Sequence, residues 1–505
     1  MINIDIFKEI QALVNYGIKC GFIEIEDEIY SINKILEVLK LDDFKCYQGD
    51  VEEDRDLDGI LENILAWSIK EGLINDTVTE KDILDTKIMA TMIPKPSQVI
   101  KEFLSNYEIN PKKATDYYYD FSKKSNYIRV ERVKKDLKWK VATEYGDLDI
   151  TINMAKPEKD PKEIAKAKTI KSSNYPKCLL CKENEGYAGH FNHPARGNHR
   201  IIPLVLNNSR WFLQYSPYVY FNEHSIVLKD EHSPMRIGRD TFVELLDFIE
   251  TFNHYFIGSN ADLPIVGGSI LTHNHYQGGN YEFAMEKAES EKQYIIKDFE
   301  DIIVSKVKWP LSAIRIACED KDRLVELATK INNSWKKYSD EEVDILAFTG
   351  ETEHNTVTPI ARFRNGKFEL DLVFRNNRTT SEYPFGIFHP HEELHHIKKE
   401  NIGLIEVMGL AVLPSRLKYE MEELKSYVLK TIRGEMVQVS ESIKKHIAWI
   451  NEVIINHGDI TEENIDKVIE EEIGKVFLKV LEDCGVFKRD AKGIKAFDKF
   501  MNLLN

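Results

Sequence analysis

Residues 262–279 read DLPIVGGSILTHNHYQGG, the densest concentration of glycines and chemically versatile side chains in the sequence. An apolar run leads into a polar end that contains His273, His275 and Gln277, with a pair of glycines on either side. Side chains alternate between the faces of a strand, so these three side chains are expected to project from one face. Flanking glycines allow close backbone approach and leave N–H groups free for phosphate oxygens. The segment therefore predicts a reactive site on a strand, and the alternative is a hairpin whose glycines only turn the chain.

Strands and helices are both expected around this segment. β-Branched and aromatic alternation predicts strands at residues 127–130 and 149–152, two or three strands within 201–228, and strand structure in 306–316. Apolar periodicity predicts helices at 240–256, with Asp240 as the N-cap, and at 321–337. Asn365-Gly366 lies between alternating runs and predicts a tight hairpin. We expect a buried strand at 403–413 and an exposed, Lys-rich connection at 157–177.

The ends of the chain are expected to be helical, because apolar residues there recur at three- and four-residue steps. A His-x-His pattern occurs twice, at His273-Asn-His275 and at His389-Pro-His391. This weak internal repeat is consistent with a duplicated domain that contains both strands and helices. The sequence thus predicts an α+β fold in four parts. These are a helical N-terminal region (1–114), a first unit with the active-site motif (115–300), a second unit (301–415) and a helical C-terminal region (416–505).

Composition excludes some classes of protein. The 505 residues are 42% hydrophobic and 30% charged, as in an ordinary globular protein. With 68 Lys and Arg against 84 Asp and Glu, the net charge of -16 disfavours nucleic acid as a partner but allows a small phosphorylated ligand. The start lacks the pattern of a secretory signal, and no apolar run is long enough to span a membrane. Six cysteines are too few for a disulfide scaffold, so we expect a cytoplasmic protein with reduced thiols.

Cys178 and Cys181 form a Cys-x-x-Cys pair. Two such cysteines and two histidines make a tetrahedral Zn²⁺ site, and the sequence offers 15 histidines as candidates. The alternatives are a redox pair or a turn without a ligand.

Two further groups could bind phosphate. Residues 389–396 hold four histidines and two glutamates, which could bind a metal or a substrate phosphate or form a solvated junction between a loop and a helix. Arg129 and Arg132 lie in strand-like sequence, and the planar guanidinium suits phosphate, although either could be a surface charge.

Residues 262–279 resemble the signature of the class II galactose-1-phosphate uridylyltransferases, members of the histidine-triad superfamily. Residues 114–129, 178–181 and 388–413 look like the same family. The resemblance implies a fold of duplicated histidine-triad-like antiparallel sheet units. It also implies exchange of UDP-glucose and galactose 1-phosphate for UDP-galactose and glucose 1-phosphate, without an organic cofactor, and a homodimer.

The resemblance also implies roles for individual residues. In the family's His-x-His-x-Gln motif the second histidine is the nucleophile, which falls on His275, and Gln277 contacts the transferred phosphoryl group. A structural zinc would be held by four residues: Cys178, Cys181, His232 and His273. His224, in a similar Glu-His-Ser setting, competes with His232 for the third position. Arg129 and Arg132 would correspond to two substrate-binding arginines of the family.

The chemistry of these residue types is consistent with nucleotidyl transfer. A neutral imidazole attacks phosphorus and leaves again, so a covalent intermediate lets one subsite serve two similar displacements. Backbone N–H groups of Gly267, Gly268 or Gly278 could stabilise the phosphoryl oxygens. An amide at Gln277 donates a hydrogen bond but no proton, which favours transfer over hydrolysis. The alternatives are a histidine-triad nucleotide hydrolase or dinucleotide phosphorylase, and a zinc-organised binding protein without turnover.

Overall fold

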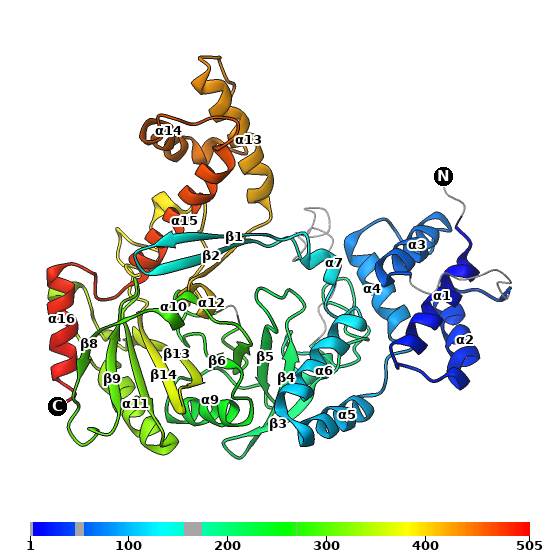
Figure 1. Cartoon of the computed structure of the whole chain (residues 1–505), viewed down its shortest axis with the longest axis horizontal. Helices are drawn as coiled ribbons and strands as arrows, with labels where there is room; N and C mark the ends of the chain where they lie inside the picture. The colour runs from blue at the N-terminus through cyan, green and yellow to red at the C-terminus, as the bar shows by residue number, and fades with distance from the viewer. Residues whose placement is uncertain (1–3, 46–54, 156–173, 269) are drawn as a thin grey trace.

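A ten-stranded antiparallel sheet forms the centre of the computed structural model, which describes residues 4–45, 55–155, 174–268 and 270–505 (Figure 1). The predicted connection at 157–177 falls mostly outside these residues. The strand order is β3-β4-β5-β7-β6-β13-β14-β10-β9-β8. In chain order the strands are β3 (Ile202–Leu206), β4 (Ser209–Tyr215), β5 (Ser225–Lys229), β6 (Phe256–Gly258), β7 (His275–Gly279), β8 (Ser290–Tyr294), β9 (Ile303–Val307), β10 (Ala313–Cys318), β13 (Asn355–Arg364) and β14 (Lys367–Asn376).

The sheet consists of two copies of one topology. In each copy three strands are followed by a helix and two more strands, with α9 (Arg239–Thr251) as the helix of the first copy and α11 (Lys321–Trp335) as that of the second. The order β3-β4-β5-β7-β6 in the first copy matches β8-β9-β10-β14-β13 in the second, and the copies meet where β6 pairs with β13. The predicted α+β class and its duplicated antiparallel units are therefore confirmed. The limits placed at residues 114, 300 and 415 stay predictions, and β8 of the second copy begins before residue 301.

Apolar cores lie on both faces of the sheet. On one face α9 and α11 pack against the strands, and alternate residues of β14, such as Leu370 and Leu372, join this core. On the other face Val373 of β14 belongs to a second core. That core also contains the three-stranded sheet β1-β2-β15, formed by β1 (Leu137–Thr143), β2 (Gly146–Ile152) and β15 (Leu410–Leu413). Among the described residues this second core takes central-sheet residues only from β6, β9, β10, β13 and β14, so it covers the second copy and leaves that face of β7 to the site.

Helices occupy both ends of the chain, as predicted (Figure 1). Tyr215 of β4 donates a hydrogen bond to the carbonyl of Thr115 (3.0 Å) in α6, and Tyr294 of β8 donates one to Asp498 (2.7 Å) in α16. Among the described residues no helix is long and apolar enough to cross a membrane. The N-terminal helices are α1 (Ile6–Lys19), α2 (Glu28–Leu39), α3 (Leu57–Lys70), α4 (Val78–Met89), α5 (Pro96–Ile109) and α6 (Pro111–Lys124); the C-terminal ones are α13 (Arg416–Ile432), α14 (Ile447–Asn456), α15 (Ile465–Cys484) and α16 (Ala491–Asn502).

Several local predictions are confirmed. Asn365 and Gly366 join β13 to β14 with φ values of 53° and 76°, the positive angles that a tight hairpin requires. The strands expected at 149–152, within 201–228 and in 306–316 correspond to β2, to β3, β4 and β5, and to β9 and β10.

Three local predictions are wrong. Residues 127–130 form no strand: Tyr127 and Ile128 are buried in a loop before the short helix α7 (Val130–Val133), so their apolar character reflects burial. The N-cap of α9 is Gly238 and not Asp240, which lies in the first turn. Residues 403–413 begin with the helix α12 (Leu404–Val407) before β15, because an apolar run alone does not separate a buried helix from a buried strand.

Candidate functional site

The faces of β7 separate packing from chemistry. Tyr276 points to α9, where its hydroxyl donates to the carboxylate of Glu244, and its ring stacks on Trp211 with centroids 4.9 Å apart. Because neighbouring side chains alternate, His275 and Gln277 lie on the opposite face. The strand therefore presents an imidazole and an amide together on the side away from the helices.

His275 is held as a neutral imidazole with a defined orientation. Its Nδ1 lies 2.8 Å from the carbonyl oxygen of His273, an arrangement in which Nδ1 carries the proton and donates it. Burial lowers the pKa of His275 to about 4, because the charged form loses its hydration. Both effects leave the lone pair on Nε2, which is the atom that a nucleophilic histidine needs.

Four predicted ligands converge into a possible metal-binding cluster. The Sγ atom of Cys178 lies 3.5 Å from that of Cys181 and 3.3 Å from Nδ1 of His273, and Nδ1 of His232 lies 3.2 Å from Sγ of Cys181. All four ligand atoms lie within 4.8 Å of one another. Two sulfurs and two imidazoles at such spacings fit a tetrahedral ion of the zinc type.

Neighbouring groups orient these ligands. Nε2 of His273 lies 2.8 Å from the carbonyl of Lys229, which leaves Nδ1 for an ion, as an outer partner of a metal-bound histidine does. The side chain of Asn184 donates to the carbonyls of Cys178 (2.9 Å) and Cys181 (2.7 Å). Burial raises the pKa of Cys178 to about 11, so its thiolate needs a cation beside it.

His224, the competing ligand, does not join the cluster. Its Nε2 instead lies 3.1 Å from Oε1 of Gln277. The structure therefore places His232 beside the cysteines and His224 beside the amide of the motif.

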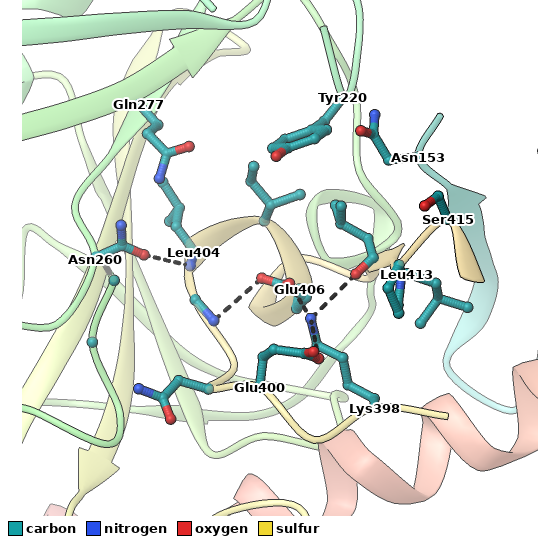
Figure 2. Close-up of a pocket in the computed structure, with 17 residues that line it drawn as sticks. Asn153, Tyr220, Asn260, Gln277, Lys398, Glu400, Leu404, Glu406, Leu413 and Ser415 are labelled. Atoms are coloured by element: carbon teal, nitrogen blue, oxygen red, sulfur yellow. Dashed lines mark hydrogen bonds and ion pairs between the residues drawn. The ribbon is translucent and has the colours of Figure 1, made fainter. Parts of the chain in front are cut away.

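A cavity of about 600 Å³ opens beside Gln277 (Figure 2). Gly267, Gly268 and Asn260 line it from the first copy of the topology. The other lining residues are Lys398, 400–401, 403–406 and 412–415, together with Asn153 and Tyr220. Mixed polar and apolar walls of this size suit a small phosphorylated sugar or nucleotide.

Sequence reasoning missed several residues of this cavity. Lys398 is only 4% exposed, and its Nζ lies 2.9 Å from the carboxylate of Glu406 and 3.2 Å from the carbonyl of Val412. In the sequence it stands in a charged run that looks solvated. Asn260 accepts a hydrogen bond from the backbone N–H of Leu404 (2.8 Å), and it lies two residues after β6, a strand that the sequence did not predict.

The glycines of the motif allow close packing. A Cβ atom on Gly267 would lie 2.4 Å from the carbonyl of Ala261, and one on Gly268 would lie 2.3 Å from the side chain of Asn260. Gly278 lies inside the sheet between β5 and β6, where a Cβ would be 2.5 Å from the carbonyl of Phe256. Their role as N–H donors to substrate stays a prediction.

The two predicted arginines lie elsewhere. Arg129 forms an ion pair with Asp85, and Arg132 forms one with Asp82. Both arginines line a second cavity of about 420 Å³, together with Leu179 of the Cys-x-x-Cys turn. They thus have carboxylate partners, and their binding of substrate stays a prediction.

The histidines of residues 389–396 do not form one cluster. His389 contacts Asn401 (3.2 Å), and His396 contacts His446 (2.9 Å) through the Nδ1 atoms. His391 and Glu393 meet Asp483 in a second group of metal-type side chains.

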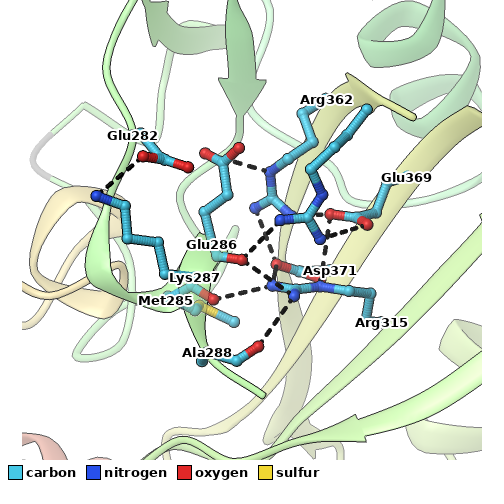
Figure 3. A network of polar contacts seen from close by, with 10 residues as sticks. Glu282, Met285, Glu286, Lys287, Ala288, Arg315, Arg362, Glu369 and Asp371 are labelled. Atoms are coloured by element: carbon cyan, nitrogen blue, oxygen red, sulfur yellow. Dashed lines mark hydrogen bonds and ion pairs between the residues drawn. The ribbon is translucent and has the colours of Figure 1, made fainter. Parts of the chain in front are cut away.

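The second copy carries an ion-pair network on the strand that corresponds to β7 (Figure 3). On β14, Asp371 lies 2.7 Å from Nε of Arg315 and 2.9 Å from Arg362, and Glu369 pairs with Arg362 and, at 2.7 Å, with Arg364. Glu286, which lies 3.8 Å from Nε of Arg362, adds a third carboxylate, so the three arginines of the network face three acidic side chains. We therefore interpret the ion pairs on β14 as stabilising the fold. The corresponding strand of the first copy, β7, instead presents an imidazole and an amide.

Comparisons with known proteins give matches along most of the chain. A family model described as "Galactose-1-phosphate uridyl transferase, N-terminal domain" matches residues 21–234, and the corresponding C-terminal domain matches residues 248–448. The galactose-1-phosphate uridylyltransferase of Clostridium acetobutylicum is 56% identical over 98% of this chain and 99% of its own. That of Bacillus subtilis is 47% identical over 99% and 98%. A crystal structure of yeast Ap4A phosphorylase covers 67% of this chain and 98% of its own at 11% identity, with a TM-score of 0.35 that is too low to carry an inference.

Proposed function

The chain belongs to the galactose-1-phosphate uridylyltransferase family, and from that premise we propose that it exchanges UMP between UDP-glucose and galactose 1-phosphate through a covalent uridylyl-His275. The observation that carries the proposal is the contact between Nδ1 of His275 and the carbonyl of His273 (2.8 Å). It leaves Nε2 unprotonated on a rigid strand.

The first displacement forms a bond between Nε2 and the phosphorus that bears uridine. The bond from that phosphorus to the oxygen of glucose 1-phosphate breaks, and the leaving oxygen keeps the electron pair. Positive charge then develops on the imidazole ring, and the hydrogen bond from Nδ1 to the carbonyl of His273 stabilises it.

The second displacement reverses the first with another sugar. A phosphate oxygen of galactose 1-phosphate attacks the phosphorus, the bond to Nε2 breaks, and UDP-galactose leaves with the imidazole restored. Neither step requires a proton, since each leaving group is already a stabilised anion or a neutral ring. Gln277 supplies a hydrogen bond to the phosphoryl oxygens, which suits transfer better than hydrolysis.

The glycine backbone of the motif is proposed to complete the phosphate site. Gly267 and Gly268 line the cavity, and their N–H groups would stabilise charge on the phosphoryl oxygens, whereas Gly278 is paired inside the sheet. Arg129 and Arg132 would help to hold the substrate if they exchange their carboxylate partners for phosphate.

A structural zinc ion is proposed at Cys178, Cys181, His232 and His273. The ligand types and the spacings of their donor atoms support it. When bound, the ion would supply a cross-link between the Cys-x-x-Cys turn and the strand that carries the nucleophile. His273 itself orients His275 through its carbonyl.

An incubation with UDP-glucose and galactose 1-phosphate tests the proposal. We expect UDP-galactose and glucose 1-phosphate in equal amounts. Release of UMP without UDP-galactose would favour a nucleotide hydrolase, and no reaction at all would favour a zinc-organised binding protein. A cytoplasmic location, a homodimer and the absence of nucleic-acid partners stay predictions.

A further inference from the structure

We propose that His224 is a positioning residue, whose Nε2–H donates to Oε1 of Gln277 and so holds the NH₂ group of that amide toward the transferred phosphoryl group. The inference rests on the proposed function, because Gln277 is given its role there. His224 itself touches no reacting atom and acts only through Gln277.

The contact between His224 and Gln277 is close and buried. The distance from Nε2 to Oε1 is 3.1 Å, and His224 is only 2% exposed. Gln277 lines the 600 Å³ cavity, and Figure 2 shows its amide at the edge of that space. Among the described residues, Nε2 of Gln277 has no hydrogen-bond partner, so one end of the amide is fixed and the other faces the cavity.

The protonation of His224 follows from its surroundings. Nδ1 is buried and has no hydrogen-bond partner, so a proton there would leave a buried N–H unsatisfied. It would also turn Nε2 into an acceptor that faces the acceptor Oε1. Burial lowers the pKa of His224 to about 4, which keeps the ring neutral near pH 7. The neutral form with the proton on Nε2 is therefore favoured. Because this N–H is a donor, it binds the carbonyl end of the Gln277 amide and not the NH₂ end.

The local backbone and rings immobilise His224. Its ring stacks on Tyr220, with centroids 5.3 Å apart and planes 27° apart, and lies 4.5 Å from the ring of Phe221. Its backbone N–H donates to Phe221 (3.2 Å), and its carbonyl accepts from Ser216 (2.7 Å). The imidazole thus has contacts on both the ring and the backbone that limit its rotation.

Gly279 lets this loop approach β7. It has φ of 156°, and a Cβ there would lie 2.7 Å from the carbonyl of Glu223 and 2.8 Å from the ring of Phe221. Pairing of Ile226 with Gln277 then fixes how far along β7 the loop reaches. The absence of a side chain at Gly279 therefore allows the loop to bring His224 within hydrogen-bond distance of the Gln277 amide.

A matched pair of variants tests the role. His224→Gln keeps a donor near the position of Nε2, whereas His224→Met has similar length and no donor. For His224→Met we expect kcat to fall about ten- to a hundredfold with both KM values within about threefold, because misorientation of a positioning group affects the reacting geometry. His224→Gln should restore kcat to within about fivefold of the wild type. In a Gln277→Ala background, His224→Met should add no further loss.

Equal kcat values for the Met and Gln variants, or a loss confined to KM, would overturn the inference. A second measurement does not depend on enzyme activity. The ¹⁵N chemical shifts of the wild-type protein, labelled at histidine, report the tautomer of His224, whose signal is identified because it is missing from the spectrum of His224→Gln. We expect the Nε2–H tautomer from pH 6 to 8. An Nδ1–H tautomer would refute the inference whether or not His224→Met folds. If the proposed function itself were wrong, the wild-type protein would form neither UDP-galactose nor a uridylyl adduct, and this result is distinct from any change caused by the His224 variants.

Discussion

The carbonyl oxygen of His273 lies 2.8 Å from Nδ1 of His275, while Nδ1 of the same His273 lies 3.3 Å from Sγ of Cys178. One residue therefore contributes its backbone to the proposed nucleophile and its ring to the possible metal site. Loss of the metal would loosen the end of β7 that orients His275. The zinc site and the reaction are thus expected to be linked through His273.

Cys178→Ser should weaken zinc binding more than about a hundredfold, because loss of a ligand exceeds the effect of losing an outer partner. The melting temperature should fall as well, since metal binding contributes to folding. Metal analysis and thermal unfolding of the purified variant measure both effects. Cys20→Ser is the control, because Cys20 is a half-buried free cysteine at the end of α1, outside the cluster. Wild-type protein that is fully active and contains no zinc would refute the metal site.

Asp85→Asn should lower the free energy of unfolding by about 3 kcal/mol, because it leaves the largely buried guanidinium of Arg129 with only the longer contact to Asp82 (3.5 Å). Asp116→Asn is the control: Asp116 pairs with Lys112 at 2.7 Å on the surface, where such a pair contributes less than about 1 kcal/mol. Urea denaturation compares the two variants. If both variants lost the same free energy of unfolding, the ion pair with Arg129 would contribute no more to stability than an ordinary surface pair.

His199 should make the protein less stable in acid. Burial, reinforced by the charge of Arg196, lowers its pKa to about 3, below the usual value of 6.5. The unfolded chain therefore binds a proton first as the pH falls below 6.5, and stability decreases through that range. Between pH 6.5 and 5 this one group should cost about 2 kcal/mol.

His199→Phe tests the assignment, because phenylalanine can keep the stacking on Tyr127 but cannot titrate. The variant loses the contact with Gln214 (2.9 Å) at every pH, so the slope of stability against pH is the quantity to compare. Denaturant midpoints between pH 7.5 and 5 should fall less steeply in the variant. Parallel curves would contradict the role of His199.

The sequence predicted those features that local chemistry specifies. Asn365-Gly366 marked its hairpin because both residues tolerate positive φ, and the alternation expected across residues 273–277 marked the faces of β7, although the strand begins only at His275. The Cys-x-x-Cys spacing indicated a metal cluster, but only the fold could separate His232 from His224, which have nearly the same sequence context.

Features that depend on long-range packing were not predicted. Lys398 looks like a surface charge until Glu406 and Val412 surround it in the fold. The apolar alternation at Tyr127 and Ile128 resembled a strand because burial in a loop selects the same residue types. Arg129 and Arg132 could not be matched to Asp85 and Asp82, since those partners lie more than forty positions away on α4.

The central claim is that Nε2 of His275 carries the uridylyl group, and mass spectrometry of intact protein mixed with UDP-glucose alone tests it most directly. We expect a mass gain of one UMP, which peptide mapping places on His275. The gain should disappear in His275→Ala and on addition of galactose 1-phosphate to the wild type. An adduct on another residue, or rapid exchange without any adduct, would contradict the account.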